Sequence, residues 1–491
     1  MWLSSFRGGV HPDGFKELST QHPIGHVPLP PKLYVPVRQH TGSASIPLVK
    51  PGERVLKGQL IGKAGSGLSA PIHAPTSGIV EDVRPVTAAH PSGHSCTAVI
   101  IDVDGLDTPI ETNTVDDPFS LTREELADRI FDAGIVGMGG AAFPAAVKLN
   151  SATKREIDTL IINGGECEPY LTADDFLMRE RANGIVEGSK IIRYIIGAKK
   201  VVVAIEDNKR EAIASMKEAT KQYDYIEVKT VPTRYLMGSA KQMIHAVTGK
   251  EVPAGGRSSD VGVLMHNVAT AYAIHQCLAE GMPLISRIVT VSGGSVVEPR
   301  NVEALIGTPI EHLIAQCGGT KSDVSRIILG GPMMGQIMPS MEVPLIKGAA
   351  GVLVLENNEI TQPSPSPCIR CGRCLNACPM GLVPLEMANH SKANDFDGAK
   401  EFGLSDCILC GSCSFVCPSH IPLVQYFQYA KGMLNHQRLD EQHVERTKQL
   451  SEARRLRQEK EAAAKAAAKA AKANKRKKTP KKAAAKSAVG E

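Results

Sequence analysis

The pattern of apolar and polar positions divides the chain into regions that predict different kinds of element. Between about residues 29 and 103, short β-branched runs alternate with Gly and Pro turns, which predicts a β-rich domain. From residue 121 to about 281, amphipathic stretches alternate with apolar runs, which predicts a parallel sheet with helices on its faces. The expected helices are 122–133, 176–196, 210–222, 240–247 and 269–280, and the expected strands are 158–163, 200–206, 226–231 and 261–266.

The pattern changes again after residue 287. Strands at 288–292 and 326–329, separated by a short helix at 309–317, predict a small β-grasp domain, with an extension of the preceding domain as the alternative. Residues 362–367 form a Pro-rich linker. After residue 437 the sequence becomes charged and then rich in Ala and Lys. It has no apolar face there, which predicts a solvated helix or disorder.

Composition narrows the class of protein. The 491 residues suffice for several domains, and no apolar run approaches the roughly 18 residues of a membrane span, so a soluble cytoplasmic protein is expected. With 4% aromatic residues and a single Trp, a carbohydrate cleft or base-stacking platform is not expected. Residues 436–491 hold 17 basic and 7 acidic residues, whereas the rest of the chain holds 39 basic and 44 acidic residues. A strongly basic tail therefore follows a mildly acidic body.

Eight of the 12 cysteines lie in two C-x2-C-x2-C-x3-C-P runs within residues 368–417. Such runs bind two 4Fe–4S clusters, and the fourth cysteine of each run ligates the cluster of the other run. The alternative, paired zinc sites, usually has two C-x2-C pairs separated by a longer loop. The predicted ligands are Cys368, Cys371, Cys374 and Cys417 for cluster 1, and Cys378, Cys407, Cys410 and Cys413 for cluster 2.

A second motif is the loop that contains Gly137, Gly139 and Gly140 and precedes a predicted helix. Pro144 suits the first turn of that helix, and its free N–H groups would face an anion that the glycines allow to approach. Lys148, one turn further on, could reach a phosphate as a point charge. The loop follows a helix, so it is not the usual dinucleotide fingerprint, and a tight helix–helix turn is the structural alternative.

Polar residues follow two predicted strands of the central domain, at the sheet edge where α/β proteins bind ligands. Asn163, in the segment Asn-Gly-Gly-Glu-Cys-Glu-Pro, could hydrogen-bond a flavin ring. Glu166 and Glu168 in the same segment could hold the ribose hydroxyls of a nicotinamide nucleotide. Asn267 and Thr270 follow the other strand.

These segments resemble a known family. The glycine loop, the segment 163–169 and Asn267-Val-Ala-Thr270 are similar to the flavin- and NADH-binding subunit of respiratory complex I. Together with 9–12, 235–242, 261–263 and the twin cysteine runs, their order resembles the RnfC subunit of the Rnf (Rsx) electron transport complex over roughly residues 6–435. In two places the chain departs from the complex I pattern. Gly165 stands where that pattern has an aspartate, and 238–240 reads Gly-Ser-Ala where it has Gly-Glu-Glu.

The resemblance implies a peripheral translocase subunit on the cytoplasmic side of a bacterial inner membrane. The complex would couple electron transfer between NAD(H) and ferredoxin to Na⁺ or H⁺ movement. Implied partners are integral-membrane and flavin-carrying subunits and ferredoxin or an equivalent. By resemblance, FMN phosphate would lie at Gly137, Gly139, Gly140 and Lys148, the isoalloxazine near Asn163 and Asn267, and NADH near Glu166 and Glu168. Thr270 is a further predicted cofactor-binding residue.

Two other functions remain open. One is a flavin-free iron–sulfur carrier or assembly scaffold that supplies electrons to a redox-sensing transcription factor. The other is nucleic-acid binding through the tail, but the basic run at 475–478 lacks interleaved aromatics, so no specific nucleic acid is expected. Contact of the tail with an anionic membrane surface is expected instead.

The predicted fold is multidomain α/β. Its first part resembles the lipoyl- and biotinyl-type barrel-sandwich hybrid, but it lacks the lysine tripeptide of those carriers, so a scaffold is expected. The predicted domains are the barrel-sandwich-like β domain 1–115, the FMN/NADH-binding parallel-sheet α/β domain 116–284, the β-grasp domain 285–355, the bacterial-type two-cluster ferredoxin domain 356–435 and the Ala/Lys-rich tail 436–491.

Overall fold

The computed structural model describes residues 6–321, 324–360 and 364–477. Two small antiparallel sheets form the N-terminal unit, in the orders β2-β8-β7-β4 and β3-β5-β6. The strands are β2 Lys32–Pro36, β3 Ile46–Pro47, β4 Arg54–Val55, β5 Leu60–Lys63, β6 Ile72–His73, β7 Gly78–Thr87 and β8 Ser95–Val103. Val35, Ile61 and Ile101 from the two sheets share one core, as the predicted β-rich domain requires.

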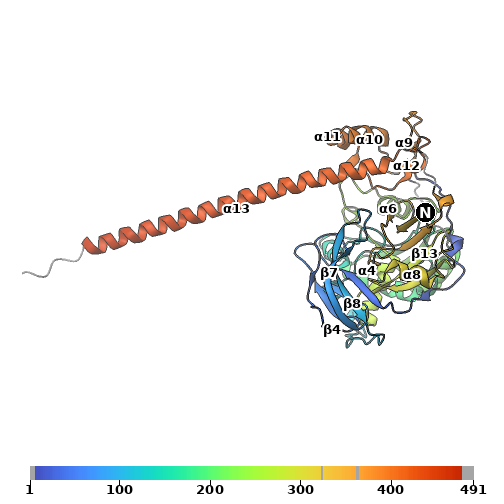
Figure 1. The fold of residues 1–491 in the computed structure, drawn as a ribbon, viewed down its shortest axis with the longest axis horizontal. Coiled ribbons are helices and arrows are strands. Elements are labelled where there is room, and N and C mark those ends of the chain that lie inside the picture. Colours follow the sequence, from blue (N-terminus) through green and yellow to red (C-terminus); the bar gives the residue numbers. More distant parts are fainter. Residues whose placement is uncertain (1–5, 322–323, 361–363, 478–491) are drawn as a thin grey trace, which may run out of the picture.

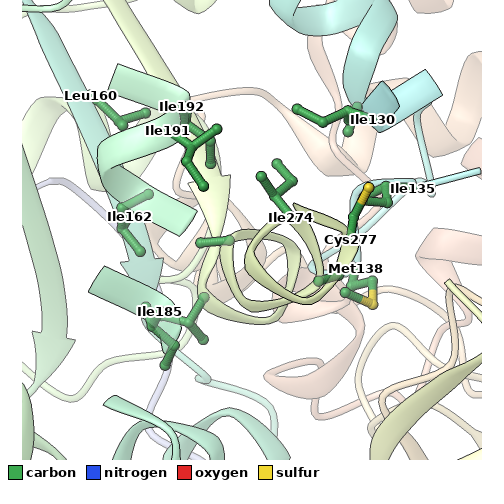
Figure 2. Packing of buried hydrophobic residues seen from close by; sticks show 14 of the residues in the cluster. Ile130, Ile135, Met138, Leu160, Ile162, Ile185, Ile191, Ile192, Ile274 and Cys277 are labelled. Atoms are coloured by element: carbon green, nitrogen blue, oxygen red, sulfur yellow. The ribbon is translucent and has the colours of Figure 1, made fainter. Parts of the chain in front are cut away.

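The central unit is a four-stranded parallel sheet with helices on both faces. Its elements are α1 Arg123–Asp132, α2 Ala145–Ala152, β9 Thr159–Gly164, α3 Ala173–Glu180, α4 Ala182–Ile196, β10 Lys200–Glu206, α5 Arg210–Thr220, β11 Ile226–Val231, α6 Ala240–Thr248, β12 Val263–Asn267 and α7 Val268–Ala279. The strand order is β11-β10-β9-β12. Leu160 and Ile162 of β9 pack with Ile191, Ile192 and Ile274 of the helices on one face (Figure 2). The residue between them packs on the other face with α6.

One predicted helix is wrong. The single helix expected at 176–196 is two helices, α3 and α4, because Arg181 leaves the helical conformation with φ −126° and ψ 27°. The break lets α4 turn onto α7 through its glycines. A Cβ on Gly188 would lie 1.8 Å from the carbonyl oxygen of Ala271, and one on Gly184 would lie 2.8 Å from the ring of Tyr272. Amphipathic periodicity does not reveal such a change of direction.

The third unit is a mixed six-stranded sheet of order β1-β14-β13-β17-β15-β16 with helix α8 packed on it. Its elements are β1 Gly25–His26, β13 Ser286–Ser292, β14 Arg300–Leu305, α8 Ile310–Gln316, β15 Arg326–Leu329, β16 Gln336–Ile337 and β17 Gly351–Leu355. β1 comes from the start of the chain and pairs in parallel with β14. The N-terminal segment therefore reaches beyond the barrel-sandwich unit.

The cysteine-rich unit contains short helices and the start of a very long one. These are α9 Arg373–Ala377, α10 Pro384–Lys392, α11 Phe396–Glu401, α12 Ser412–Phe415 and α13 Leu423–Lys477. The first turns of α13 bury Leu423, Phe427 and Ala430, and the helix then projects away from the body, with residues 435–474 exposed (Figure 1). Residues 478–491 of the predicted tail lie outside the described residues. No described helix combines the length and apolarity of a membrane span.

Candidate functional site

The two predicted strand-end segments lie side by side at the carboxyl edge of the central sheet. Asn163 and Asn267 are register partners in the parallel pair β9–β12. The Asn267 amide donates to the carboxylate of Asp174 at 2.6 Å, and its oxygen accepts from the N–H of Ala269 at 2.8 Å, which caps α7. The Asn163 amide donates to the carbonyl of Gly238 at 2.8 Å. Both asparagines therefore organise the loops at this edge.

The glycine loop packs directly on this edge. The N–H of Met138 donates to the hydroxyl of Thr270 at 3.0 Å, and a Cβ on Gly139 would lie 2.8 Å from Cβ of Asn267. The loop is closed at its base, where the N–H of Gly137 donates to the carbonyl of Phe143 at 2.8 Å. The structure thus brings together Gly137, Gly139, Thr270 and the asparagines, which are far apart in the sequence.

The exposed part of the loop fits a phosphate group. Gly139, Gly140 and Ala141 are exposed, and a Cβ on Gly140 would meet no atom within 4 Å. Residues 138–141 form a turn, but none of the N–H groups of residues 139–143 lies at normal hydrogen-bond distance and angle from an acceptor among the described residues. Free N–H groups in a glycine-rich loop before a helix are suitable ligands for an anion.

Lys148 lies close to the loop but is engaged elsewhere. Its ammonium donates to the carbonyl of Met265 on β12. Burial lowers the pKa of Lys148 to about 8, so much of its population is still charged at neutral pH. The lysine therefore adds positive charge beneath the edge that carries the glycine loop.

Glu166 is buried at the start of α3. Its carboxylate accepts from the N–H of Asp174 at 3.0 Å and from that of Asp175 at 3.4 Å. Burial raises the pKa of Glu166 to about 7. Lys209 lies beside it and pairs with the buried Glu206 at 2.6 Å. Glu166 thus combines a helix-capping contact with a pKa that permits protonation near neutral pH.

Glu168 points to the third unit. Its two carboxylate oxygens accept from the N–H groups of Met333 and Met334 at 3.0 and 2.9 Å, and burial raises its pKa to about 7. A lysine that the sequence did not predict, Lys16, ties this segment together. Its ammonium donates to the carbonyls of Glu166, Glu168 and Leu171 at 2.9, 3.0 and 2.6 Å. Lys16 begins a short 3-10 helix, Lys16–Ser19, and a single lysine outside any motif carries no signal of such a role.

Gly165, one of the two departures from the complex I pattern, lies against Gly238, the glycine that the pattern shares. A Cβ on Gly165 would lie 2.7 Å from Cε of Met243, and one on Gly238 would lie 2.0 Å from the carbonyl oxygen of Gly165. The two glycines are therefore in close contact, and an aspartate at 165 would require the flexible end of the Met243 side chain to move.

The eight clustered cysteines surround two cavities. Within the described part of the chain, no three His, Cys, Asp or Glu side chains converge closely enough to hold one metal ion. A cubane cluster, which takes one thiolate at each iron, suits such a donor set. One cavity, of about 120 Å³, is lined by Cys368, Cys371, Cys374 and Cys417. The other is lined by Cys378, Cys407, Cys410 and Cys413.

The second cysteine cavity lies against the central unit. The Tyr235 hydroxyl donates to the carbonyl of Cys410 at 2.5 Å, and the Gln242 amide donates to that of Pro379 at 3.2 Å. Tyr235 and Cys410 belong to one buried cluster, against which Cys167 packs. Burial raises the pKa of Cys167 to about 12, so its thiol stays protonated and it is not a nucleophile.

A larger surface cavity of about 910 Å³ lies away from these groups. It is lined by Arg181, Lys221 and His275 among others, around the C-terminal ends of α3 and α5. None of the predicted site residues lines it.

Comparison with known proteins finds four family models along the chain. They are the RnfC barrel sandwich hybrid domain at residues 4–106, the Nuo51 FMN-binding domain at 130–276, the SLBB domain at 288–336 and a 4Fe–4S dicluster domain at 367–421. The RnfC-type subunit of the ion-translocating oxidoreductase complex of Rhodobacter capsulatus is 48% identical over 88% of this chain and 83% of its own length. The corresponding subunit from Haemophilus influenzae (strain 86-028NP) is 43% identical over 94% of this chain and 69% of its own length.

Among solved structures, an NAD⁺-reducing NiFe-hydrogenase superposes with a TM-score of 0.45 and 16% identity, over 65% of this chain and 62% of that one. This likeness is too low to support a functional argument.

Proposed function

The chain belongs to the RnfC family of ion-translocating oxidoreductase complex subunits, and we propose that it is the subunit through which NAD(H) exchanges electrons with such a complex. As a member of this family it is an electron-transfer subunit of an oxidoreductase. It contains an FMN-binding domain and a 4Fe–4S dicluster domain. The proposal concerns which residues hold these groups and in which order electrons pass.

In this proposal the glycine loop binds the phosphate of FMN. Gly137 closes the loop, Gly139 allows it to pack on the sheet edge, and Gly140 leaves space for the ligand. Lys148 contributes positive charge from below. Bound FMN supplies the change between two-electron hydride transfer and single electrons.

The strand-end residues shape the rest of the site. Asn163, Asn267 and Thr270 hold the loops against which the isoalloxazine would lie. Glu166 and Glu168 are proposed to lie near NADH. Because their carboxylates accept hydrogen bonds from backbone N–H groups, they would also position the surrounding loops for the nucleotide.

The cysteines are proposed to ligate two 4Fe–4S clusters in the crossed arrangement. The two cavities support this, because each contains three cysteines of one run and the last cysteine of the other. The ligands would be Cys368, Cys371, Cys374 and Cys417 for cluster 1, and Cys378, Cys407, Cys410 and Cys413 for cluster 2.

The observation that carries the electron route is the buried junction between the flavin domain and cluster 2. Tyr235 joins the segment next to Gly238 to the backbone of Cys410. In contrast, Cys368 and Cys371 are exposed. We therefore expect electrons to pass from the flavin site to cluster 2, then to cluster 1 and then to a partner, with the reverse order when NAD⁺ is reduced.

The test is the cofactor content and reduction of anaerobically purified protein. We expect about eight irons per chain and bound FMN, and NADH should bleach the iron–sulfur absorbance. Gly139→Val should lose FMN and bleaching by NADH, while dithionite still bleaches the clusters. Full iron without flavin in the unaltered protein would favour the flavin-free carrier or scaffold, including one that serves a redox-sensing transcription factor.

The partners follow from membership of a multi-subunit complex. We propose that integral-membrane and flavin-carrying subunits and ferredoxin or an equivalent accept or deliver the electrons. The protein would lie peripherally on the cytoplasmic side of a bacterial inner membrane. The basic tail would add contact with anionic lipid.

A further inference from the structure

The N-terminal β unit makes direct contact with the glycine loop. The hydroxyl of Thr41, in the loop between β2 and β3, donates to the carbonyl of Ala141 at 2.5 Å. The N–H of Thr41 donates to the carbonyl of Ala142 at 3.2 Å. A residue of the unit expected to be only a scaffold thus holds two successive carbonyls at the tip of the proposed phosphate loop.

The loop that carries Thr41 is rigidly supported. The N–H of Ala70 donates to Nε2 of His40 at 3.1 Å. Because Nε2 then accepts, the ring proton is assigned to Nδ1, which donates to the carbonyl of Thr41 at 3.2 Å. At Gly42 φ is +116°, and a Cβ there would lie 2.1 Å from the carbonyl oxygen of Leu68. Thr41 is therefore presented by a turn whose shape its own unit determines.

The tip of the glycine loop is in a conformation that needs such support. Ala142 has φ +49°, in the left-handed region that non-glycine residues rarely occupy. Because a trans peptide is planar, a carbonyl held toward Thr41 turns the N–H of the same peptide to the opposite side. The Thr41 contacts thereby orient the N–H group of Ala142, at the end of the turn formed by residues 138–141, and that of Phe143, which has no hydrogen-bond partner among the described residues.

The base of the loop is held by a second buried contact. The ammonium of Lys347 donates to the carbonyl of Gly134 at 2.7 Å and to that of Pro71 in the N-terminal unit at 3.0 Å. Gln39, two residues before Thr41, accepts from the N–H of Lys347 at 3.1 Å. Thr41 therefore holds the tip of the glycine loop directly, whereas Lys347 of the third unit links the segment before the loop, at Gly134, to Pro71 and Gln39 of the N-terminal unit.

We propose that Thr41 is a positioning residue for flavin binding, which holds the glycine loop in the shape that receives the phosphate of FMN. The inference rests on the proposed site of the FMN phosphate. The barrel-sandwich unit lacks the lysine that carries the cofactor in lipoyl and biotinyl domains. Through Thr41 it would nevertheless contribute to the cofactor site. Without the hydroxyl, the loop would have to be ordered by the phosphate itself, and binding would weaken.

The test compares flavin binding in the full-length protein after removal of flavin, with clusters retained. Thr41→Val removes the hydroxyl but keeps the side-chain shape, and the Kd for FMN should rise roughly fivefold to tenfold. The Kd for riboflavin, which lacks the phosphate, should be unchanged. Hydrogen exchange of Gly137 and Met138, the loop residues whose N–H groups are hydrogen-bonded, should become faster in the flavin-free protein.

Two further variants serve as controls. Thr41→Ser restores the hydroxyl and should bind FMN as the unaltered protein does. Ser43→Ala removes a hydroxyl that contacts only its own unit, at Ser66 and Leu68, and should leave FMN affinity unchanged.

The outcomes separate the role of Thr41 from the proposed phosphate site. If the unaltered protein prefers FMN to riboflavin and Thr41→Val keeps the full preference, the role of Thr41 is overturned while the phosphate site stands. If the unaltered protein binds both flavins equally, or Gly139→Val keeps FMN, the glycine loop is not the phosphate site and both proposals fail.

Discussion

Lys347 is a charged residue in an uncharged setting. It is 1% exposed, its ammonium contacts only backbone carbonyls, and no described carboxylate forms an ion pair with it. Burial lowers its pKa from 10.5 to about 7. The folded protein therefore holds the lysine partly neutral at physiological pH, at a point where three units of the fold meet.

This pKa predicts a pH dependence of stability. Between pH 7 and 10.5 the unfolded chain binds a proton at Lys347 that the folded chain does not bind. The free energy of unfolding should therefore increase with pH in this range, by up to about 1.4 kcal/mol per pH unit. Lys347→Met lacks this contribution and leaves two buried carbonyls without a donor. The melting temperature of Lys347→Met should therefore fall further below that of the unaltered protein as the pH rises from 6.5 to 8.5.

Lys32→Met is the matched control. The Lys32 side chain is 40% exposed, and its contact with Glu81 keeps its pKa above 10.5, so it stays protonated in both states over this range. A constant deficit for Lys347→Met across the range would contradict the assigned protonation.

At the scale of elements, the approach of α4 to α7 depends on glycine. Gly188→Ala would place a methyl group against the carbonyl of Ala271, and we expect a loss of about 1–3 kcal/mol. Gly432→Ala in α13 would meet no atom within 4 Å, and we expect a gain of up to about 1 kcal/mol from helix propensity. Calorimetric melting of the two variants should show shifts of opposite sign.

The crossed cysteine ligands make a second prediction at this scale. Cys378→Ser and Cys407→Ser should each lose one cluster, and because both remove the same one, their combination should lose no more iron than either alone. Cys378→Ser with Cys368→Ser should lose both clusters. Iron analysis after anaerobic purification measures this, and additive loss in the first pair would contradict the crossed arrangement.

The same scale shows what the sequence could predict. β10 and β11 have the predicted bounds because buried parallel strands are continuous apolar runs between polar ends. The break at Arg181 was missed because it arises from packing between α4 and α7. Lys16 and Thr41 were missed for a related reason. Their contacts join residues more than 90 positions apart, and neither lies in a motif.

At the scale of the whole molecule, α13 carries its basic end far from the body. A helix rises about 1.5 Å per residue, so residues 435–477 span roughly 60 Å. We expect deletion of residues 462–491, which hold ten basic residues and one acidic residue, to leave NADH-linked reduction unchanged. Co-sedimentation with anionic vesicles should decrease, most clearly at low salt.

The outcome of this deletion is informative in either direction. Equal vesicle binding with and without the tail at low ionic strength would exclude a membrane tether. Nucleic acid that co-purifies only with the full-length chain would instead support the nucleic-acid alternative.

The N-terminal segment has a consequence for how the protein is made. Val10 pairs with Tyr235, and the N–H of Gly9 donates to the carbonyl of Ala377, next to the ligand loop of the cysteine unit. Residues 9 and 10 therefore dock on partners that lie more than 200 positions later in the chain, and this contact cannot form until those partners have been synthesised. Because Ala377 precedes Cys378, a proposed cluster ligand, we expect loss of that cluster to loosen the contact. Added protease should then cleave this segment faster in cluster-free protein than in loaded protein.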